Sequence, residues 1–388
     1  MNPVIETLSR LVEINSINPE WAGPGEREAA TFVREFFERA GIEVWEEEVL
    51  PNRPNIIARL PGVNPDRRIV LEAHMDVVSV ADMTIPPFEP RIEDGLLYGR
   101  GSCDTKAGLA AMMQAMVALK ESGQTPPCDI WLGAVVDEEH AYRGVVSLIE
   151  TLEKTGPTPE AAVVAEPTQL RVVRANKGAL RWKIATRGVS AHSSKPHLGK
   201  SAITAMAKVV LALEADEQLL AKREPHPLVG PPTCSIGVIA GGAQVNFVPE
   251  HCEITLDRRM LPGETAEGVI AHYEHLLDRV RSENPDIDVK IQPPYLADEA
   301  METPADAEVV NAMSRVLAEL GHDPEPCGVP FGCDCSKLSR AGIPSVIFGP
   351  GSIDQAHGAV EFVEIKQVEA AFEFYKRFLM EFGSDSAA

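Results

Sequence analysis

The chain has 388 residues, 44% of them hydrophobic, a composition typical of a globular protein that is long enough for two domains. Its 58 acidic residues outnumber its 36 basic residues, and the net charge of −22 disfavours binding to nucleic acid or to an anionic membrane surface. A small anionic substrate is not excluded, because a few arginines or a metal ion can reverse the potential locally.

Three features of the sequence favour a cytoplasmic protein. The N-terminus lacks the basic start and unbroken apolar core of a secretory signal. No apolar run approaches the length of a membrane span. The seven cysteines are an odd number without paired spacing, which favours reduced thiols. Cys333 and Cys335 lack the further ligands of a soft-metal site, so we expect them to be structural.

The first sixty residues predict two helices followed by two strands. Apolar residues at helical spacing predict helices over Val4–Val12 and Gly25–Ala40, and Gly41 suits the end of the second helix. Strand-like runs follow at Ile42–Val49 and Asn55–Leu60. We assign no site residue to this part of the chain.

The next strand, Arg68–His74, ends in polar residues of the kind that bind metals. Because side chains alternate along a strand, His74 and Asp76 lie on the same side, where Asp76 can orient or polarise His74 as a ligand. A single histidine after a strand is more often structural, so this motif decides little alone.

A glycine-rich loop, Leu97–Gly108, precedes a helix predicted over Leu109–Lys120. The loop matches neither the dinucleotide-binding pattern G-x-G-x-x-G nor the phosphate-binding pattern G-x-x-x-x-G-K-[ST]. Asp104 lies just before the helix, where it either caps the helix or belongs to a site.

Two further strands also end in carboxylates. The apolar strand Asp129–Val136 runs into Asp137, Glu138, Glu139 and a histidine, and either solvation at the strand end or a metal cation must relieve the repulsion. A helix is expected over Tyr142–Leu152, and the next strand ends in Glu166.

Together, these strand ends predict a metal centre. Strand ends of an α/β sheet converge on one edge, and the side chains are all of hard-oxygen or imidazole type. Two divalent ions fit the number of acids better than one, because three carboxylates would neutralise a single ion as a Lewis acid. One bridging carboxylate would hold two ions roughly 3.5–4 Å apart.

The order of these motifs resembles the co-catalytic zinc hydrolases. The chain carries His-x-Asp, Gly-Arg-Gly-x-x-Asp-x-Lys, Asp-Glu-Glu, Glu-Pro-Thr and a C-terminal His in that order. The family includes acetylornithine deacetylase, succinyl-diaminopimelate desuccinylase, glutamate carboxypeptidase and aminoacylase, and the resemblance covers nearly the whole chain. It implies an α/β catalytic domain with a mixed sheet flanked by helices, and an inserted α+β lid and dimerisation domain.

The resemblance also implies a ligand set for two metal ions. His74 and Glu166 would bind the first ion, and Glu139 would bind the second. Asp104 would bridge the two ions. The last ligand would be His357, in a loop after the strand Ser345–Phe348. The ions are expected to be zinc, with cobalt as an alternative in vitro.

In the same family pattern, Glu138 is the general base. It would take a proton from the metal-bridging water and pass it to the leaving amine. Neighbouring side chains of an extended chain point in opposite directions, which is consistent with different roles for Glu138 and Glu139. Asp76 would support His74, and Asp137 would be a supporting hydrogen-bond acceptor.

The pattern of the chain changes after Lys177, and we expect an inserted domain over 178–292 between two parts of the catalytic domain, 1–177 and 293–388. The inserted domain is predicted to contain a four-stranded antiparallel sheet and two helices. These elements are expected at Ala179–Arg187, Gly199–Glu214, Cys234–Ala240, His251–Arg258, Glu264–Arg281 and Ile287–Ile291. The chain is expected to end in a helix, Lys366–Phe382.

Three residues of the inserted domain match family positions. His192 would enter the active site of the partner subunit and stabilise the tetrahedral oxyanion. Asn246 and Arg259 would hold the free carboxylate of the substrate, for which the fork of an arginine is suited. Ordinary surface ion pairs remain the alternative for Arg258 and Arg259.

The sequence thus predicts a dinuclear-zinc hydrolase that cleaves the amide bond of an N-acyl amino acid, similar to acetylornithine deacetylase, and acts as a homodimer through the inserted domain. A desuccinylase, or a metallocarboxypeptidase or dipeptidase acting on short peptides, is the alternative within the family. A catalytically silent relative that only binds metal or ligand is the alternative outside it, although the presence of Glu138 argues against silence. Cys333, where the family often has Thr or Ser, leaves the acyl and side-chain preference open.

Overall fold

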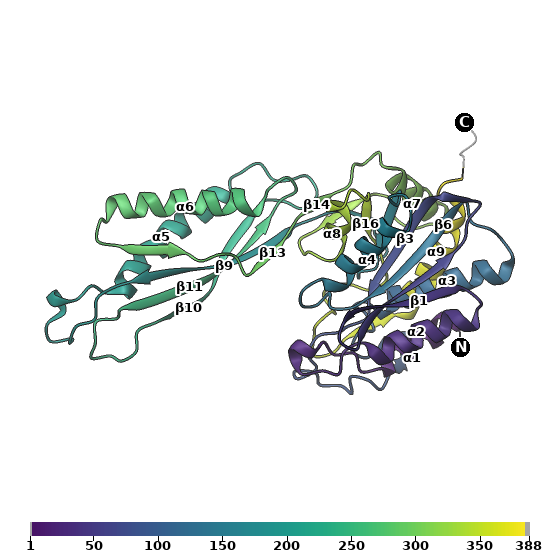
Figure 1. Ribbon diagram of the computed structural model, residues 1–388, viewed down its shortest axis with the longest axis horizontal. Coiled ribbons are helices and arrows are strands. Elements are labelled where there is room, and N and C mark those ends of the chain that lie inside the picture. Colours follow the sequence, from purple (N-terminus) through teal and green to yellow (C-terminus); the bar gives the residue numbers. More distant parts are fainter. Residues whose placement is uncertain (1, 385–388) are drawn as a thin grey trace. The chain divides into compact units, whose positions relative to one another are not determined.

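The computed structural model describes residues 2–384, which fold into two compact units (Figure 1). The first unit contains the chain up to Arg174, then Thr303–Cys327 and the part from Cys333 onward. The second contains Ala175–Glu302 and Gly328–Gly332. The chain therefore leaves the first unit twice, once for most of the second unit and once for the five residues Gly328–Gly332, and returns each time.

A mixed sheet runs through the first unit in the order β1-β2-β6-β3-β7-β16-β8. Strands β6, β3, β7 and β16 are parallel neighbours, while β1, β2 and β8 join through antiparallel pairs. The strands are β1 Glu43–Leu50, β2 Arg53–Leu60, β3 Asn64–His74, β6 Cys128–Val135, β7 Ala161–Val164, β8 Val173–Asn176 and β16 Ser345–Ile347. This is the mixed α/β sheet that the sequence predicted.

Helices cover both faces of this sheet (Figure 1). Helices α1, α2, α3, α7 and α9 share one hydrophobic core with the sheet. Helices α4 and α8 pack against each other and against the same sheet, α4 on β6, β1 and β2 and α8 on β16 and β7. Their bounds are α1 Pro3–Glu13, α2 Arg27–Arg39, α3 Lys106–Ser122, α4 Arg143–Thr155, α7 Glu308–Glu319, α8 Cys335–Arg340 and α9 Ile365–Glu381. Because both faces are covered, β6 is buried at every position, which explains its continuous apolar run.

Several short elements complete the chain. A three-stranded antiparallel sheet joins β17 Phe362–Glu364, β5 Leu96–Tyr98 and β4 Arg91–Glu93. Short strands at β14 Met301–Glu302 and β15 Cys327–Val329 pair with β8. Single 3₁₀ turns lie at Pro19–Trp21 and Pro196–Leu198. At three residues or fewer, these strands and turns are too short to leave a periodic signal in the sequence.

The second unit contains an antiparallel sheet in the order β10-β11-β9-β12, to which a short strand, β13, adds by pairing with β9. The elements are β9 Gly178–Arg187, α5 Ala202–Leu220, β10 Thr233–Gly241, β11 His251–Met260, α6 Ala266–Glu283, β12 Asp288–Ile291 and β13 Leu296–Asp298. The sheet therefore has five strands rather than the predicted four, because three-residue β13 lies beyond the predicted end of this domain. Helices α5 and α6 share a core with the sheet.

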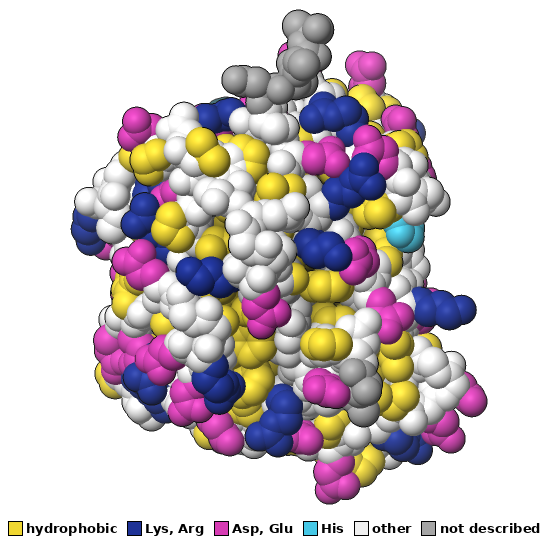
Figure 2. All heavy atoms as spheres, turned by 90° about the vertical axis from the view of Figure 1, so that its right-hand side faces the viewer, with side chains coloured by type: hydrophobic (Ala, Val, Ile, Leu, Met, Phe, Trp, Pro, Cys, Tyr) yellow, Lys and Arg dark blue, Asp and Glu magenta, His cyan; other side chains and the backbone are white. Residues whose placement is uncertain are grey.

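The face of the first unit drawn in Figure 2 carries Lys and Arg side chains interspersed with Asp and Glu, without a continuous basic area on that face. This distribution agrees with the overall acidic charge. Among the residues that the structure describes, no helix is both long enough and apolar enough to cross a membrane.

Candidate metal centre

The parallel strands of the first unit bring the predicted ligands to one edge of the sheet. His74 is the last residue of β3, Glu139 follows β6, and Glu166 follows β7. His357 lies in the loop that leaves the parallel neighbour β16. Because the carboxyl ends of parallel strands lie on the same edge, one strand end and three loops bring these side chains to that edge.

Asp104 joins the other ligands from the turn before α3. The N-terminal cap position of α3 is Thr105, and no side chain caps the helix there. Instead, the Asp104 carboxylate faces two histidines: its Oδ1 lies 3.1 Å from Nε2 of His74, and its Oδ2 lies 3.3 Å from Nε2 of His357. The carboxylate of Asp104 therefore lies between two histidines and does not cap the helix.

The ligand atoms form two groups that share Asp104. His74, Asp104 and Glu166 make one group, and Asp104, Glu139 and His357 make the other, with all ligand atoms of a group within 4.8 Å of one another. In the first group, Nε2 of His74 lies 3.9 Å from Oε1 of Glu166; in the second, Nε2 of His357 lies 3.1 Å from Oε1 of Glu139. One carboxylate that offers each oxygen to a different group is the arrangement of a bridging ligand.

The chemistry of these donors fits two divalent cations. Each group offers one imidazole nitrogen and two carboxylates, a donor set that suits zinc and similar metals. Nδ1 of His74 lies 2.9 Å from the main-chain oxygen of Asp76, which can only accept, so Nδ1 carries the proton. The Nε2 lone pair of His74 is then directed at the group that contains Asp104 and Glu166.

Burial and crowding shift the titration of the site. Burial raises the pKa of the Glu166 carboxyl well above its usual value, and the nearby Asp104 charge adds to this shift. Burial alone would raise the pKa of Asp104, but hydrogen bonds with His357 and His74 hold it well below its usual range. Hydrogen bonds to Asp104 and Glu139 raise the pKa of His357 to about 10.

We expect metal binding to strengthen as the pH rises. His357 of the metal-free protein is protonated at neutral pH, because its pKa is about 10. A metal ion binds only the deprotonated ring, so each displaced proton should strengthen binding roughly tenfold per pH unit between about pH 6 and pH 8. Calorimetric titration of metal-free protein with zinc, in two buffers of different ionisation enthalpy, measures the protons released. Equal heats in both buffers would contradict this expectation.

Glu138 lies in a tight loop that the surrounding residues hold in place. Asp137 and Tyr142, at the two ends of this loop, have φ values of 70° and 58°. The main-chain oxygen of Asp137 accepts the N–H groups of Ala141 and Tyr142. The loop turns Glu139 towards His357, and Glu138 and Glu139 are both half-buried. Burial of its carboxyl raises the pKa of Glu138 well above its usual value.

Asp76 supports this loop more closely than it supports His74. Its carboxylate accepts the main-chain N–H groups of Glu138 and Glu139 at 3.1 and 3.2 Å. Towards His74, the main-chain oxygen of Asp76 is the nearer partner, whereas the carboxylate lies 3.6 Å from Nδ1. The side chain that was expected to orient the histidine therefore also fixes the backbone of the two glutamates.

A buried network behind the loop was not predicted from the sequence. Asn18 donates to Asp76 and to Asp137, at 2.8 and 3.0 Å. Arg53 forms a two-bond ion pair with Glu26, at 2.6 Å for each bond, and also donates to Asp137 at 3.0 Å. Asp137 is thus a hydrogen-bond acceptor, as expected. Asn18 and Arg53 come from the first 53 residues, where no motif distinguishes them from surface polar residues. Arg143, the first residue of α4, also pairs with Asp137 at 3.2 Å.

Two of the predicted site residues, the oxyanion residue His192 and the substrate-binding residue Asn246, lie together in the second unit. His192 forms an isolated β-bridge with Phe247, and the N–H of Ser193 donates to the main-chain oxygen of Asn246 at 2.9 Å. Nδ1 of His192 accepts the N–H of Ser194 at 3.2 Å, so Nε2 carries the proton of the neutral ring. The exposed His192 therefore presents a hydrogen-bond donor at Nε2.

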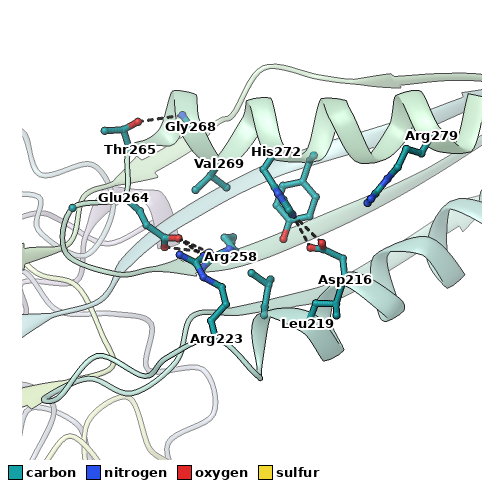
Figure 3. A pocket seen from close by; sticks show the side chains of 13 residues that line it. Asp216, Leu219, Arg223, Arg258, Glu264, Thr265, Gly268, Val269, His272 and Arg279 are labelled. Carbon is teal, nitrogen blue, oxygen red and sulfur yellow. Dashed lines mark hydrogen bonds and ion pairs between the residues drawn. The ribbon is translucent and has the colours of Figure 1, made fainter.

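The two neighbouring arginines of β11 lie on opposite faces of the sheet. Arg258 is only 2% exposed and lines a cavity of about 560 Å³ beside α5 and α6. Figure 3 shows Arg258 and Arg223 both bonded to Glu264 in this cavity, at 3.0 and 2.9 Å. Arg259 points to the other face by strand alternation and pairs with Asp257 at 2.8 Å, so it is the more accessible of the two.

Comparison with known proteins identifies the family. The sequence model of Peptidase family M20/M25/M40 matches residues 70–381. Acetylornithine deacetylase of Myxococcus xanthus is 32% identical over 88% of this chain and 86% of its own length. A Peptidase M20 domain-containing protein of Schizosaccharomyces pombe is 30% identical over 95% of this chain and 82% of its own length.

Solved structures agree on the fold. The aminopeptidase PepT of Bacillus cereus superposes with a TM-score of 0.79, at 23% identity, over 98% of both chains. The match includes both the mixed sheet flanked by helices and the separate antiparallel sheet. With a family model that spans most of the sequence, the chain is a hydrolase that belongs to peptidase family M20/M25/M40.

Proposed function

We propose that this protein hydrolyses the amide bond of an N-acyl amino acid, with two zinc ions, in the manner of acetylornithine deacetylase. The observation that carries the proposal is the carboxylate of Asp104, which offers one oxygen to each of two donor groups. The similarity to acetylornithine deacetylase of Myxococcus xanthus supports the choice of substrate class. The family membership supports the reaction type, hydrolysis of a linear amide.

In this proposal, the ligands are His74, Glu166, Glu139 and His357, with Asp104 as the bridge. Bound zinc ions would lower the pKa of water and polarise the substrate carbonyl. These five side chains would hold the ions at the edge of the sheet, and the loops described above fix the directions of the side chains.

In this proposal, Glu138 is the general base that transfers the proton of the attacking water. Its raised pKa brings the carboxyl closer to the working pH, where a general base is most effective. It would accept a proton from the attacking water and return that proton to the leaving amine. Asp76, which holds the N–H groups of Glu138 and Glu139, keeps the base and the neighbouring ligand in fixed relative positions.

The inserted domain would complete the site in a homodimer. His192 of the partner subunit would donate from Nε2 to the oxyanion, and Asn246 and Arg259 would hold the free carboxylate of the substrate. The edge strand β10 supports a dimer, because its Val238 and Ile239 are 58% and 60% exposed and its outer backbone has no strand partner within the unit. A cytoplasmic location is part of the proposal, and the seven free cysteines are compatible with it.

A substrate panel tests the proposal. Zinc- or cobalt-loaded protein should cleave N-acetyl amino acids with a higher kcat/KM than N-succinyl amino acids or dipeptides. Converting the free carboxylate of the best substrate to an amide should lower kcat/KM about 10- to 100-fold, because a hydrogen bond to a charged group contributes about 1.5–3 kcal/mol.

Each other outcome points to a different conclusion. Preference for N-succinyl substrates would indicate a desuccinylase, and preference for dipeptides would indicate a peptidase. No turnover of any of the three classes would contradict an enzymatic role on these amides. Equal rates with the acid and the amide would remove Arg259 from the substrate contact.

A further inference from the structure

A buried ion pair lies behind the second donor group, outside the residues discussed so far. Glu361 is 0% exposed and Arg100 is 2% exposed. Oε2 of Glu361 accepts a hydrogen bond from Nη1 of Arg100 at 2.6 Å. Oε1 of Glu361 accepts the main-chain N–H groups of Cys103 and Asp104, at 2.9 and 3.1 Å. Both oxygens of the buried carboxylate are therefore occupied, and one is bonded to the backbone of the shared ligand Asp104.

The same pair ties together three loops, each of which follows or carries a ligand. Nη2 of Arg100 donates to the main-chain oxygens of Ser79 and Gly358, at 3.0 and 3.5 Å. Ser79 follows the strand that ends in His74, and Gly358 is the residue after His357. The N–H of Gly99 donates to the main-chain oxygen of Glu361 at 3.1 Å, so the backbones next to the two paired side chains are also hydrogen-bonded to each other.

We propose that Arg100 and Glu361 are positioning residues that set the directions of Asp104 and His357 towards two metal ions. The inference rests on the two-ion centre of the proposed function. A carboxylate that serves two ions must hold both of its oxygens in fixed directions, and small displacements of a ligand weaken metal binding. Glu361 fixes the backbone of Asp104, and Arg100 fixes the loop of His357 to the same carboxylate.

The neutral change Glu361→Gln tests this role in the full-length protein. The glutamine keeps the size of the side chain and an oxygen that can accept an N–H, but it removes the ion pair with Arg100. Zinc titration of the metal-free variant, in competition with a chelator, should show about 10- to 100-fold weaker binding of both ions, since Asp104 belongs to both groups. Glu364→Gln is the matched control, an exposed acid three residues further on, and should bind zinc as the wild type does.

A second measurement separates positioning from general stability. The melting temperature of metal-free Glu361→Gln reports folding, whereas its zinc affinity reports the orientation of the ligands. If this variant does not fold, Arg100→Lys takes its place. Lysine keeps the positive charge, but its single ammonium group cannot bond to Glu361, Ser79 and Gly358 at once as the forked guanidinium does. We expect this variant to show the same loss of zinc affinity.

The outcomes distinguish the two proposals. Wild-type zinc affinity for both ions in a folded Glu361→Gln or Arg100→Lys protein would overturn the positioning role. A wild-type protein that binds fewer than two ions would instead contradict the two-ion centre itself. A loss of affinity in the two variants but not in Glu364→Gln would support the inference.

Discussion

Replacing Glu138 with glutamine is expected to lower kcat by about 100- to 10,000-fold, the range that a positioned general base contributes. The amide cannot accept a proton from water at neutral pH, so the water stays a weak nucleophile. KM should change little, because Glu138 does not belong to either donor group or to the proposed carboxylate contacts.

The metal content of this variant decides between the two neighbouring glutamates. Glu138→Gln should retain two ions per chain, measured by elemental analysis after dialysis. Glu139→Gln is the matched control, since Oε1 of Glu139 faces His357 at 3.1 Å, and it should lose one ion. Loss of an ion from Glu138→Gln would mean that the base and the ligand have been assigned the wrong way round.

Replacing His192 with alanine should lower kcat by about 100- to 1,000-fold, as observed when one oxyanion donor is removed. Metal content should stay at the wild-type level, because His192 belongs to the second unit and to neither donor group. His197→Ala, which changes another exposed histidine five residues further on, is the matched control and should remain active.

Mixing the two inactive variants tests whether His192 acts across the dimer. In a mixed dimer of Glu138→Gln and His192→Ala chains, one of the two sites would combine an intact Glu138 with an intact His192 from the other chain. Random exchange of subunits should restore about one quarter of the wild-type activity, because half of the dimers are mixed and each has one intact site. If activity does not recover on mixing, His192 does not act in the neighbouring subunit.

The ends of the central strands could be predicted because the signal there is local. A buried parallel strand is a short apolar run, and a polar residue directly after it must lie at the sheet edge, as His74 and Glu166 do. The order of the motifs then identified the family, which the matching family model confirms.

The supporting residues could not be predicted, because their partners are distant in sequence. Asn18 and Arg53 reach Asp137 across 119 and 84 positions, and neither residue stands in a pattern that predicts such a contact. Arg100 did stand in a recognised motif, Gly-Arg-Gly, but its partner Glu361 is 261 positions away. Spacing along the chain contains little information about which buried charges will meet.

The discontinuity of the first unit has a consequence for synthesis on the ribosome. Strand β16 is made after the whole of the second unit, yet it lies between β7 and β8, which are made before it. Until β16 emerges, the strand between β7 and β8 is missing from the nascent sheet. The backbone groups on that edge of β7 then have no strand partner. His357 is translated later still. The first donor group, His74, Asp104 and Glu166, can therefore assemble on a growing chain before the second, which must wait for His357.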